Sequence, residues 1–161
     1  RVFEINRNFR NEGISTQHNP EFTMLEFYLA YADYRDLMLL TEELFTEVAT
    51  RTLGKNEVTF GEHEISFNAP FARVSLRDSA AEAASQRLGT NIRPEDLRSL
   101  ERITKIAERL EIEIDSSIGA GKIALEIFET LCQGQLVQPT FVYDFPTEVS
   151  PLSKQKNKCK I

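Results

Sequence analysis

Two stretches of alternating apolar and polar residues near the start of the chain most constrain how it can fold. In the first, RVFEINRNF, Phe3 and Ile5 lie on one side of an extended strand and most of the polar residues on the other. In the second, EFTMLEFY, Leu25 and Phe27 likewise share one side. Because a polar loop at 13–19 separates the two stretches, the pattern predicts an antiparallel hairpin with an aliphatic face and a chemically mixed face.

The mixed face of this hairpin carries Arg10, Glu12, Phe22, Glu26 and Tyr28. Solvated polar side chains are expected on the outer face of an antiparallel sheet, which is one interpretation of the pattern. The set also contains a cation, two carboxylates, an aromatic ring and a phenol, which together suit a molecule with a phosphate, a flat base and an amine. The residues by themselves leave both interpretations open.

The rest of the chain shows mainly helical spacing of apolar residues. This spacing predicts four helices, over residues 33–54, 75–89, 94–110 and 121–133. Asp33 is a good N-cap for the first, and Ser75 and Asp78 have the spacing of a capping box for the second. A short hairpin is expected around Gly61 and a strand within 139–146, so the predicted fold class is α+β.

The composition argues against several classes of function. The formal net charge of −6 disfavours an extended phosphate-binding surface. Cys132 and Cys159 are far apart, without a CxxC pair, and the chain has only two histidines, so neither a zinc site nor a disulfide framework is expected. No apolar run is long enough to cross a membrane, and reduced thiols indicate a cytoplasmic protein.

The stretch SSIGAGKIA is similar to a phosphate-binding glycine loop but fails two of its requirements. The pattern needs Gly where Ser116 stands, and Ser or Thr where Ile123 stands. We therefore interpret Gly119 and Gly121 as the turn that enters a helix, with Lys122 solvated.

The residues of the predicted hairpin closely resemble motif 2 of the class II aminoacyl-tRNA synthetases. That motif has an Arg-x-Glu strand, a variable loop and a strand ending in Phe-x-x-x-Glu, which FRNE and HNPEFTMLEFY match. The His-Asn-Pro-Glu-Phe-Thr sequence with the following Glu-x-Tyr is similar to the lysyl-tRNA synthetases of this class. RVFEINRNFRNEGIS and EVSPLSK match the same enzymes, so the resemblance extends to Lys154. It implies part of a class II antiparallel sheet flanked by helices, with a helical insertion.

The resemblance implies an ATP-binding role for several of these positions. Arg10 matches the catalytic arginine that binds the α-phosphate of ATP, and a guanidinium on a rigid strand is suited to neutralise charge that develops there. Phe22 matches the ring that stacks on adenine. The other matching positions lie beside Arg10 or in the loop: Asn11, Glu12, His18 and Asn19.

Glu26 and Tyr28 match the pair that recognises the substrate lysine in this family. A partly desolvated carboxylate pairs well with an ammonium, and a phenol adds a directional hydrogen bond. The resemblance implies that lysine attacks ATP to give lysyl-adenylate and is then transferred to tRNA(Lys), which requires no protein nucleophile. It also implies that the complete enzyme is a homodimer that does not bind a membrane, and that it uses Mg²⁺, whose ligands are not in this chain.

The resemblance covers only part of such an enzyme. The chain shows no motif 1, no motif 3 and no anticodon-binding barrel, and Gln17 stands where the family commonly has arginine. We therefore expect a partial catalytic domain over 1–154 that has little or no activity alone. Its expected parts are the motif 2 hairpin at 1–32, a helix-rich segment with the insertion at 33–138, and a further strand at 139–154. A divergent tail is expected at 155–161.

Two other functions stay open from the sequence. One is a non-catalytic remnant that binds a nucleotide or a partner. The other is the paralogue that attaches a lysine-like amino acid to a translation elongation factor. That paralogue shares the His-Asn-Pro-Glu-Phe-Thr pattern but lacks the insertion, so the stretch from Leu53 to Gln138 argues against it.

Overall fold

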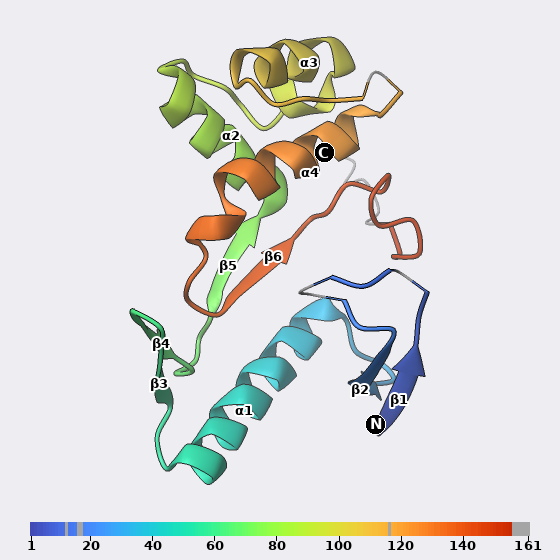
Figure 1. Cartoon of the computed structure of the whole chain (residues 1–161), viewed down its shortest axis with the longest axis vertical. Helices are drawn as coiled ribbons and strands as arrows, with labels where there is room; N and C mark the ends of the chain where they lie inside the picture. The colour runs from blue at the N-terminus through green and yellow to red at the C-terminus, as the bar shows by residue number, and fades with distance from the viewer. Residues whose placement is uncertain (12, 16–17, 116, 156–161) are drawn as a thin grey trace. The chain divides into compact units, whose positions relative to one another are not determined.

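The computed structural model contains two compact units, Arg1–Leu44 and Phe45–Ile161 (Figure 1). It describes residues 1–11, 13–15, 18–115 and 117–155. The first unit contains two strands, β1 (Val2–Phe9) and β2 (Glu21–Tyr28). Helix α1 (Tyr34–Leu53) begins in the first unit and ends in the second.

Strands β1 and β2 form the antiparallel hairpin that their alternating sequences predict. Glu4 lies directly opposite Glu26, and Asn8 lies directly opposite Phe22. Side chains at paired positions point to the same side of a sheet. The predicted hairpin and the residues assigned to each side are therefore confirmed, but the face predicted to be aliphatic also carries Arg7, Thr23 and Glu21 near the loop.

Helix α1 begins and ends where its sequence predicts. The carboxylate Oδ1 of Asp33 accepts a hydrogen bond from the Arg35 N–H at 2.7 Å and so caps the first turn. At the other end, the Gly54 N–H donates to the Thr50 carbonyl at 3.0 Å, and Gly54 has a φ of 71°. Glycine adopts this left-handed conformation at little cost, which explains why the helix stops there.

The second unit contains the hydrophobic core. Its three main helices are α2 (Leu76–Leu88), α3 (Leu100–Arg109) and α4 (Ala120–Leu131). Helix α4 packs against both α2 and α3 (Figure 1), and we call this cluster the three-helix core. Its largest fully buried side chains are Leu76, Leu97, Ile103, Ile123 and Ile127.

Serine and glycine caps mark the ends of the core helices. At the start of α2, Ser75 Oγ accepts a hydrogen bond from the Asp78 N–H, and Gly89 ends that helix with a φ of 60°. Both features agree with the sequence prediction. At the start of α3, Ser99 Oγ accepts the Arg102 N–H in the same way.

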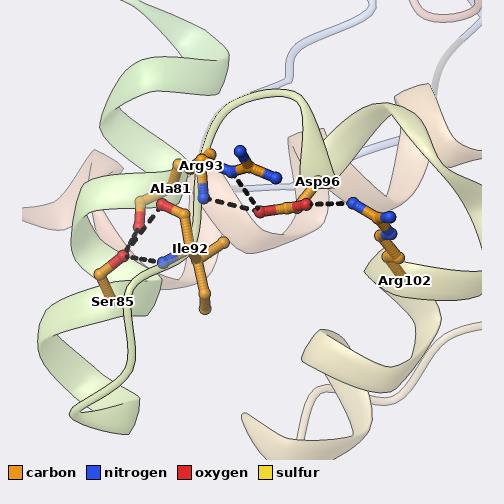
Figure 2. A network of polar contacts seen from close by, with 6 residues as sticks. All are labelled: Ala81, Ser85, Ile92, Arg93, Asp96 and Arg102. Atoms are coloured by element: carbon orange, nitrogen blue, oxygen red, sulfur yellow. Dashed lines mark hydrogen bonds and ion pairs between the residues drawn. The ribbon is translucent and has the colours of Figure 1, made fainter.

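The helix predicted over 94–110 begins later than its periodicity indicates. Residues Asp96–Arg98 form a separate 3-10 turn, η1, and α3 starts only beyond it. The Asp96 carboxylate accepts hydrogen bonds from the Arg93 N–H at 3.0 Å and the Arg102 guanidinium at 2.6 Å (Figure 2). These bonds stabilise a turn ahead of α3, so the prediction was wrong at this boundary.

A second contact in Figure 2 connects the segment after α2 back to that helix. Ser85 Oγ donates to the Ala81 carbonyl at 2.7 Å and accepts the Ile92 N–H at 2.9 Å. The Ile92 side chain is buried and joins the three-helix core. One hydroxyl thus satisfies two backbone groups while an apolar side chain packs beside it.

Four short strands complete the second unit. β3 (Glu57–Phe60) and β4 (His63–Ser66) form the predicted antiparallel hairpin around Gly61. β6 (Thr140–Tyr143), also predicted, pairs in parallel with β5 (Ala72–Ser75), which the sequence analysis missed because four residues carry too little alternation. The described strands form three two-stranded sheets, and the fold class is α+β as expected.

Candidate functional site

The mixed face of the hairpin is ordered by the register of β1 and β2. Arg10 continues β1 with the same parity as Asn8, and its N–H donates to the Pro20 carbonyl at 2.9 Å. The register therefore brings the predicted cation, ring, phenol and one of the two carboxylates onto one face. The pairs on this face, beginning next to the loop, are Asn8 with Phe22, Asn6 with Met24, Glu4 with Glu26, and Val2 with Tyr28.

Arg10 and Phe22 are in direct contact on this face. The guanidinium carbon of Arg10 lies over the Phe22 ring, 5.4 Å from its centroid, within the range of a cation–π interaction. The Phe22 side chain is half-buried, whereas Arg10 is exposed. A flat apolar surface therefore lies beside a positive charge, an arrangement that suits a base joined to a phosphate.

Two carboxylates face each other further along the mixed face. Glu4 and Glu26 are paired across the strands, where the side chains start about 4.5–5.5 Å apart. Like charges at paired positions are unfavourable, and neither carboxylate has an ion-pair partner among the described residues. Glu26 is half-buried and Tyr28, one pair further on, is 64% exposed. The carboxylate pair is therefore a negative site that a bound cation would stabilise.

The loop between the strands is described only in part. His18 is held by Ser15, whose Oγ accepts the His18 N–H at 3.0 Å and lies 2.9 Å from the ring nitrogen Nδ1. Asn11 and Asn19 are exposed. The predicted ATP-contacting residue Glu12 lies outside the described residues.

The glycines that precede and begin α4 make room for one of the chain's own carboxylates. The Gly121 N–H donates to Oε2 of Glu148 at 3.1 Å. A Cβ on Gly119 would clash with that same oxygen, and a Cβ on Gly121 would lie 2.7 Å from the Cβ of Pro146. The close approach of an internal anion to a helix N-terminus accounts for both glycines without a phosphate ligand.

Cys132 is a core side chain rather than a nucleophile. Burial, together with the nearby Glu82 carboxylate, raises the pKa of its thiol, which disfavours the reactive thiolate. Its Sγ donates to the Ser79 carbonyl at 3.5 Å.

Metal-binding and membrane-spanning features are absent from the part of the chain that the structure describes. No group of three His, Cys, Asp or Glu side chains there is placed to hold a metal ion. Within the same residues, no helix combines the length and the apolar character that crossing a membrane requires.

An open cavity of about 380 Å³ lies around the end of β2 and the first turns of α1. Its walls include residues 29–32 and the side chains of Leu39 and Leu40. None of the predicted site residues lines it, so the cavity and the mixed face are separate features of the first unit.

Glu4 and Asn8 lie beside the predicted site residues on the mixed face, although the sequence analysis assigns them no role. Strand alternation places Glu4 there, but its direct pairing with Glu26 becomes clear only from the register. Asn8 has the same parity and lies opposite Phe22. The even-numbered positions of β1 were the available signal for both residues.

Comparison with known families gives one match that covers nearly the whole chain. The family model described as tRNA synthetases class II (D, K and N) matches residues 1–160. This match includes the hairpin, α1 and the three-helix core.

Curated relatives over the same region are lysine–tRNA ligases. The chain is 47% identical to the Photorhabdus laumondii enzyme over 157 residues, which is 98% of this chain and 30% of the relative. It is 46% identical to the Edwardsiella ictaluri enzyme and 48% identical to that of Pectobacterium carotovorum, with the same coverage. The chain thus spans 30% of the length of the curated relatives it matches.

Proposed function

We propose that this chain, which belongs to the class II tRNA synthetases of the D, K and N family, forms part of the ATP- and lysine-binding site of a lysine–tRNA ligase. The observation that carries the proposal is the mixed face, where Glu26 shares one side of a hairpin with Arg10 and Phe22. The names of the relatives support lysine as the amino acid.

In the proposed reaction, the lysine carboxylate attacks the α-phosphorus of ATP and pyrophosphate leaves, which forms lysyl-adenylate. Arg10 neutralises negative charge on the α-phosphate from a position that the strand fixes in advance. Phe22 stacks on adenine, which orients the nucleotide. The protein therefore contributes positioning and charge, and it needs no covalent intermediate.

Lysine is proposed to place its ammonium against the carboxylate of Glu26. This carboxylate is half-buried and faces Glu4, so an ammonium there offsets the repulsion between two like charges. Tyr28 adds a phenol at the next pair on the same face. An uncharged amino acid would leave the carboxylates unpaired, which supplies selectivity.

The loop residues complete the proposed ATP site. Asn11 and Glu12 are proposed to contact ATP beside Arg10, and His18 and Asn19 to contact its triphosphate. Gln17 lies outside the described residues, as Glu12 does. Arginine at position 17 would add a cation to this loop, so we expect weaker phosphate contacts with glutamine.

In the complete enzyme, this chain is proposed to form one part of the catalytic domain. The hairpin is proposed to belong to a class II antiparallel sheet flanked by helices. The partial catalytic domain is proposed to span residues 1–154. Its three parts are the hairpin segment 1–32, the segment 33–138 that contains the insertion, and the segment 139–154 that contains the further strand. The complete enzyme is proposed to be a cytoplasmic homodimer that transfers lysine to tRNA(Lys). The complete enzyme is also proposed to use Mg²⁺, and the described residues form no cluster suited to hold this ion.

The proposal is tested in a chimeric ligase, in which this segment replaces the matching 157 residues of the Photorhabdus laumondii enzyme. ATP–pyrophosphate exchange should depend on lysine. Glu26→Gln should lower kcat/KM for lysine by about 10- to 150-fold, because it removes a charge-assisted hydrogen bond, while the KM for ATP stays nearly unchanged.

A matched control lies on the same strand. Glu21 is on the opposite face of β2, paired with Phe9 and 3.4 Å from the Arg7 guanidinium. Glu21→Gln should leave both substrate requirements unchanged. Equal effects of Glu26→Gln on lysine and ATP, or an effect of Glu21→Gln as large as that of Glu26→Gln, would contradict the assigned role.

A further inference from the structure

Two side-chain nitrogens are buried without a hydrogen-bond partner among the described residues, namely Nδ2 of Asn8 and Nε of Arg77. Burial and the nearby Arg98 lower the pKa of Arg77, while the carboxylates of Glu148 and Asp144 act in the opposite direction, so charged groups already surround this side chain. Asn8 is uncharged and lies on the mixed face of the hairpin. A buried donor without an acceptor is unfavourable, and in a native protein it calls for an explanation such as a ligand.

The position of Asn8 connects it with the proposed nucleotide site. Asn8 pairs directly with Phe22 and precedes Arg10 by two residues, so about 6–7 Å of strand separates the two residues on one face. Within β1, Asn8 alone is half-buried, while the other seven residues are exposed. A half-buried amide therefore shares one face of the hairpin with the ring and the cation that the proposed function assigns to ATP.

We propose that Asn8 is a further nucleotide-binding residue, whose Nδ2 donates a hydrogen bond to an acceptor atom of ATP. This inference rests on the proposed function, since it takes the mixed face to be the ATP site. ATP carries acceptors both on the adenosine part and on its phosphoryl groups. A hydrogen bond from Asn8 to either one pairs a donor that has no partner among the described residues.

Binding at Asn8 is expected to involve the Arg10 side chain. Nδ2 of Asn8 is inaccessible to water in this conformation, so a ligand reaches it only if neighbouring side chains move. Arg10 is exposed and its guanidinium lies over the Phe22 ring. A phosphate competes with the ring for that cation, because charge-assisted hydrogen bonds are stronger than most cation–π contacts. We therefore expect the Arg10 guanidinium to leave the Phe22 ring for the phosphate when ATP binds.

The test is calorimetric titration of the chimeric ligase with ATP in the absence of lysine. Asn8→Leu removes the amide at similar size, and Asn8→Asp keeps an acceptor while removing the donor. Loss of one hydrogen bond should raise the Kd for ATP by about 2- to 12-fold in Asn8→Leu. Asn8→Asp should raise it at least as much, since its charge also repels phosphate.

Thr23→Val is the matched control. Thr23 is exposed on the opposite face of the hairpin, where it pairs with Arg7. This substitution should change the Kd for ATP by less than about 2-fold, as is usual at an exposed position. An unchanged Kd in Asn8→Leu would overturn the inference. So would a fall in Tm with equal losses of ATP and lysine binding, which indicates a structural role.

Titration with adenosine identifies the acceptor atom. If Asn8→Leu weakens the binding of adenosine and of ATP by the same factor, the acceptor belongs to the base or ribose. If it weakens only the binding of ATP, the acceptor is a phosphoryl oxygen. Either result supports the inference. Failure of the proposed function can be told apart from failure of this inference. It would appear as ATP–pyrophosphate exchange that does not depend on lysine, whereas the titrations with ATP and adenosine contain no lysine.

Discussion

The hairpin and the three-helix core differ in how their apolar side chains are used. All residues of β1 and β2 are exposed or half-buried, and Phe3 and Phe9 are each 72% exposed. In the three-helix core, Ile103 and Ile127 are completely buried. A two-stranded hairpin has little stability of its own, so most of the stabilising burial in this chain belongs to the core.

The same two regions differ in the opposite sense in their chemistry. The hairpin places a cation, an aromatic ring and two facing carboxylates on one face. In the second unit, the carboxylate of Glu148 already accepts the Gly121 N–H at the start of α4. We therefore expect substitutions in the core to change stability first, and substitutions on the mixed face to change ligand binding first.

The largest effect on stability is expected from Ile127→Ala. Ile127 is fully buried in α4, and shortening it leaves a cavity that the neighbouring helices fill only in part. The free energy of unfolding of the chain, measured with urea, should fall by about 2–5 kcal/mol. Leu100→Ala is the control, since Leu100 is 53% exposed, and equal losses in both variants would contradict the assignment of the core.

A smaller effect is expected from Gly121→Ala. The new Cβ would lie 2.7 Å from the Cβ of Pro146, which is buried and has little freedom to move. The resulting shift should destabilise the chain by about 1–2 kcal/mol in the same urea measurement. Gly134→Ala, where nothing lies within 4 Å, should instead stabilise it slightly. If both alanines behaved alike, the close contact at Gly121 would not be the cause.

The smallest effect is expected from Asp96→Asn and depends on pH. Hydrogen bonds from the Arg93 backbone and the Arg102 side chain lower the pKa of Asp96 below its ordinary value. Its contribution to stability is therefore complete above the unfolded-state pKa and is lost as the pH falls through the lower folded-state pKa. The stability difference between parent and variant should be constant above about pH 5 and shrink below about pH 4.

The control for Asp96 is Glu95→Gln. The Glu95 side chain forms no hydrogen bond or ion pair among the described residues. Its substitution should leave the acid dependence of the parent unchanged. A difference between parent and Asp96→Asn that stays constant from pH 7 to pH 3 would contradict the role of the Asp96 contacts.

The sequence predicts those features that local patterns encode. The faces of the hairpin follow from alternation, and the ends of α1 and α2 follow from Asp33, Ser75 and the glycines after each helix. The start of α3 does not, because the Asp96 turn depends on an ion pair with a side chain six residues further along.

Contacts between residues far apart in the sequence could not be predicted, because local patterns do not encode them. The parallel pairing of β5 with β6 joins one strand that precedes the three core helices in the sequence to another that follows them. On the mixed face, alternation predicts that Phe22 and Glu26 share a side with Arg10, whereas the exact pairing of Glu4 with Glu26 requires the register. The roles of these residues in binding stay predictions.

The most direct test of the division between stability and binding is the Tm of the chimeric ligase and its Glu26→Gln variant, each with and without lysine. Without lysine, the account predicts a Tm for the variant equal to or slightly above that of the parent, because Glu26 has no ion-pair partner among the described residues and its charge faces Glu4. With lysine at 100 times its Kd for the parent, the parent should be stabilised, and the variant should gain about half of that or less. Equal stabilisation of both proteins by lysine would contradict the account.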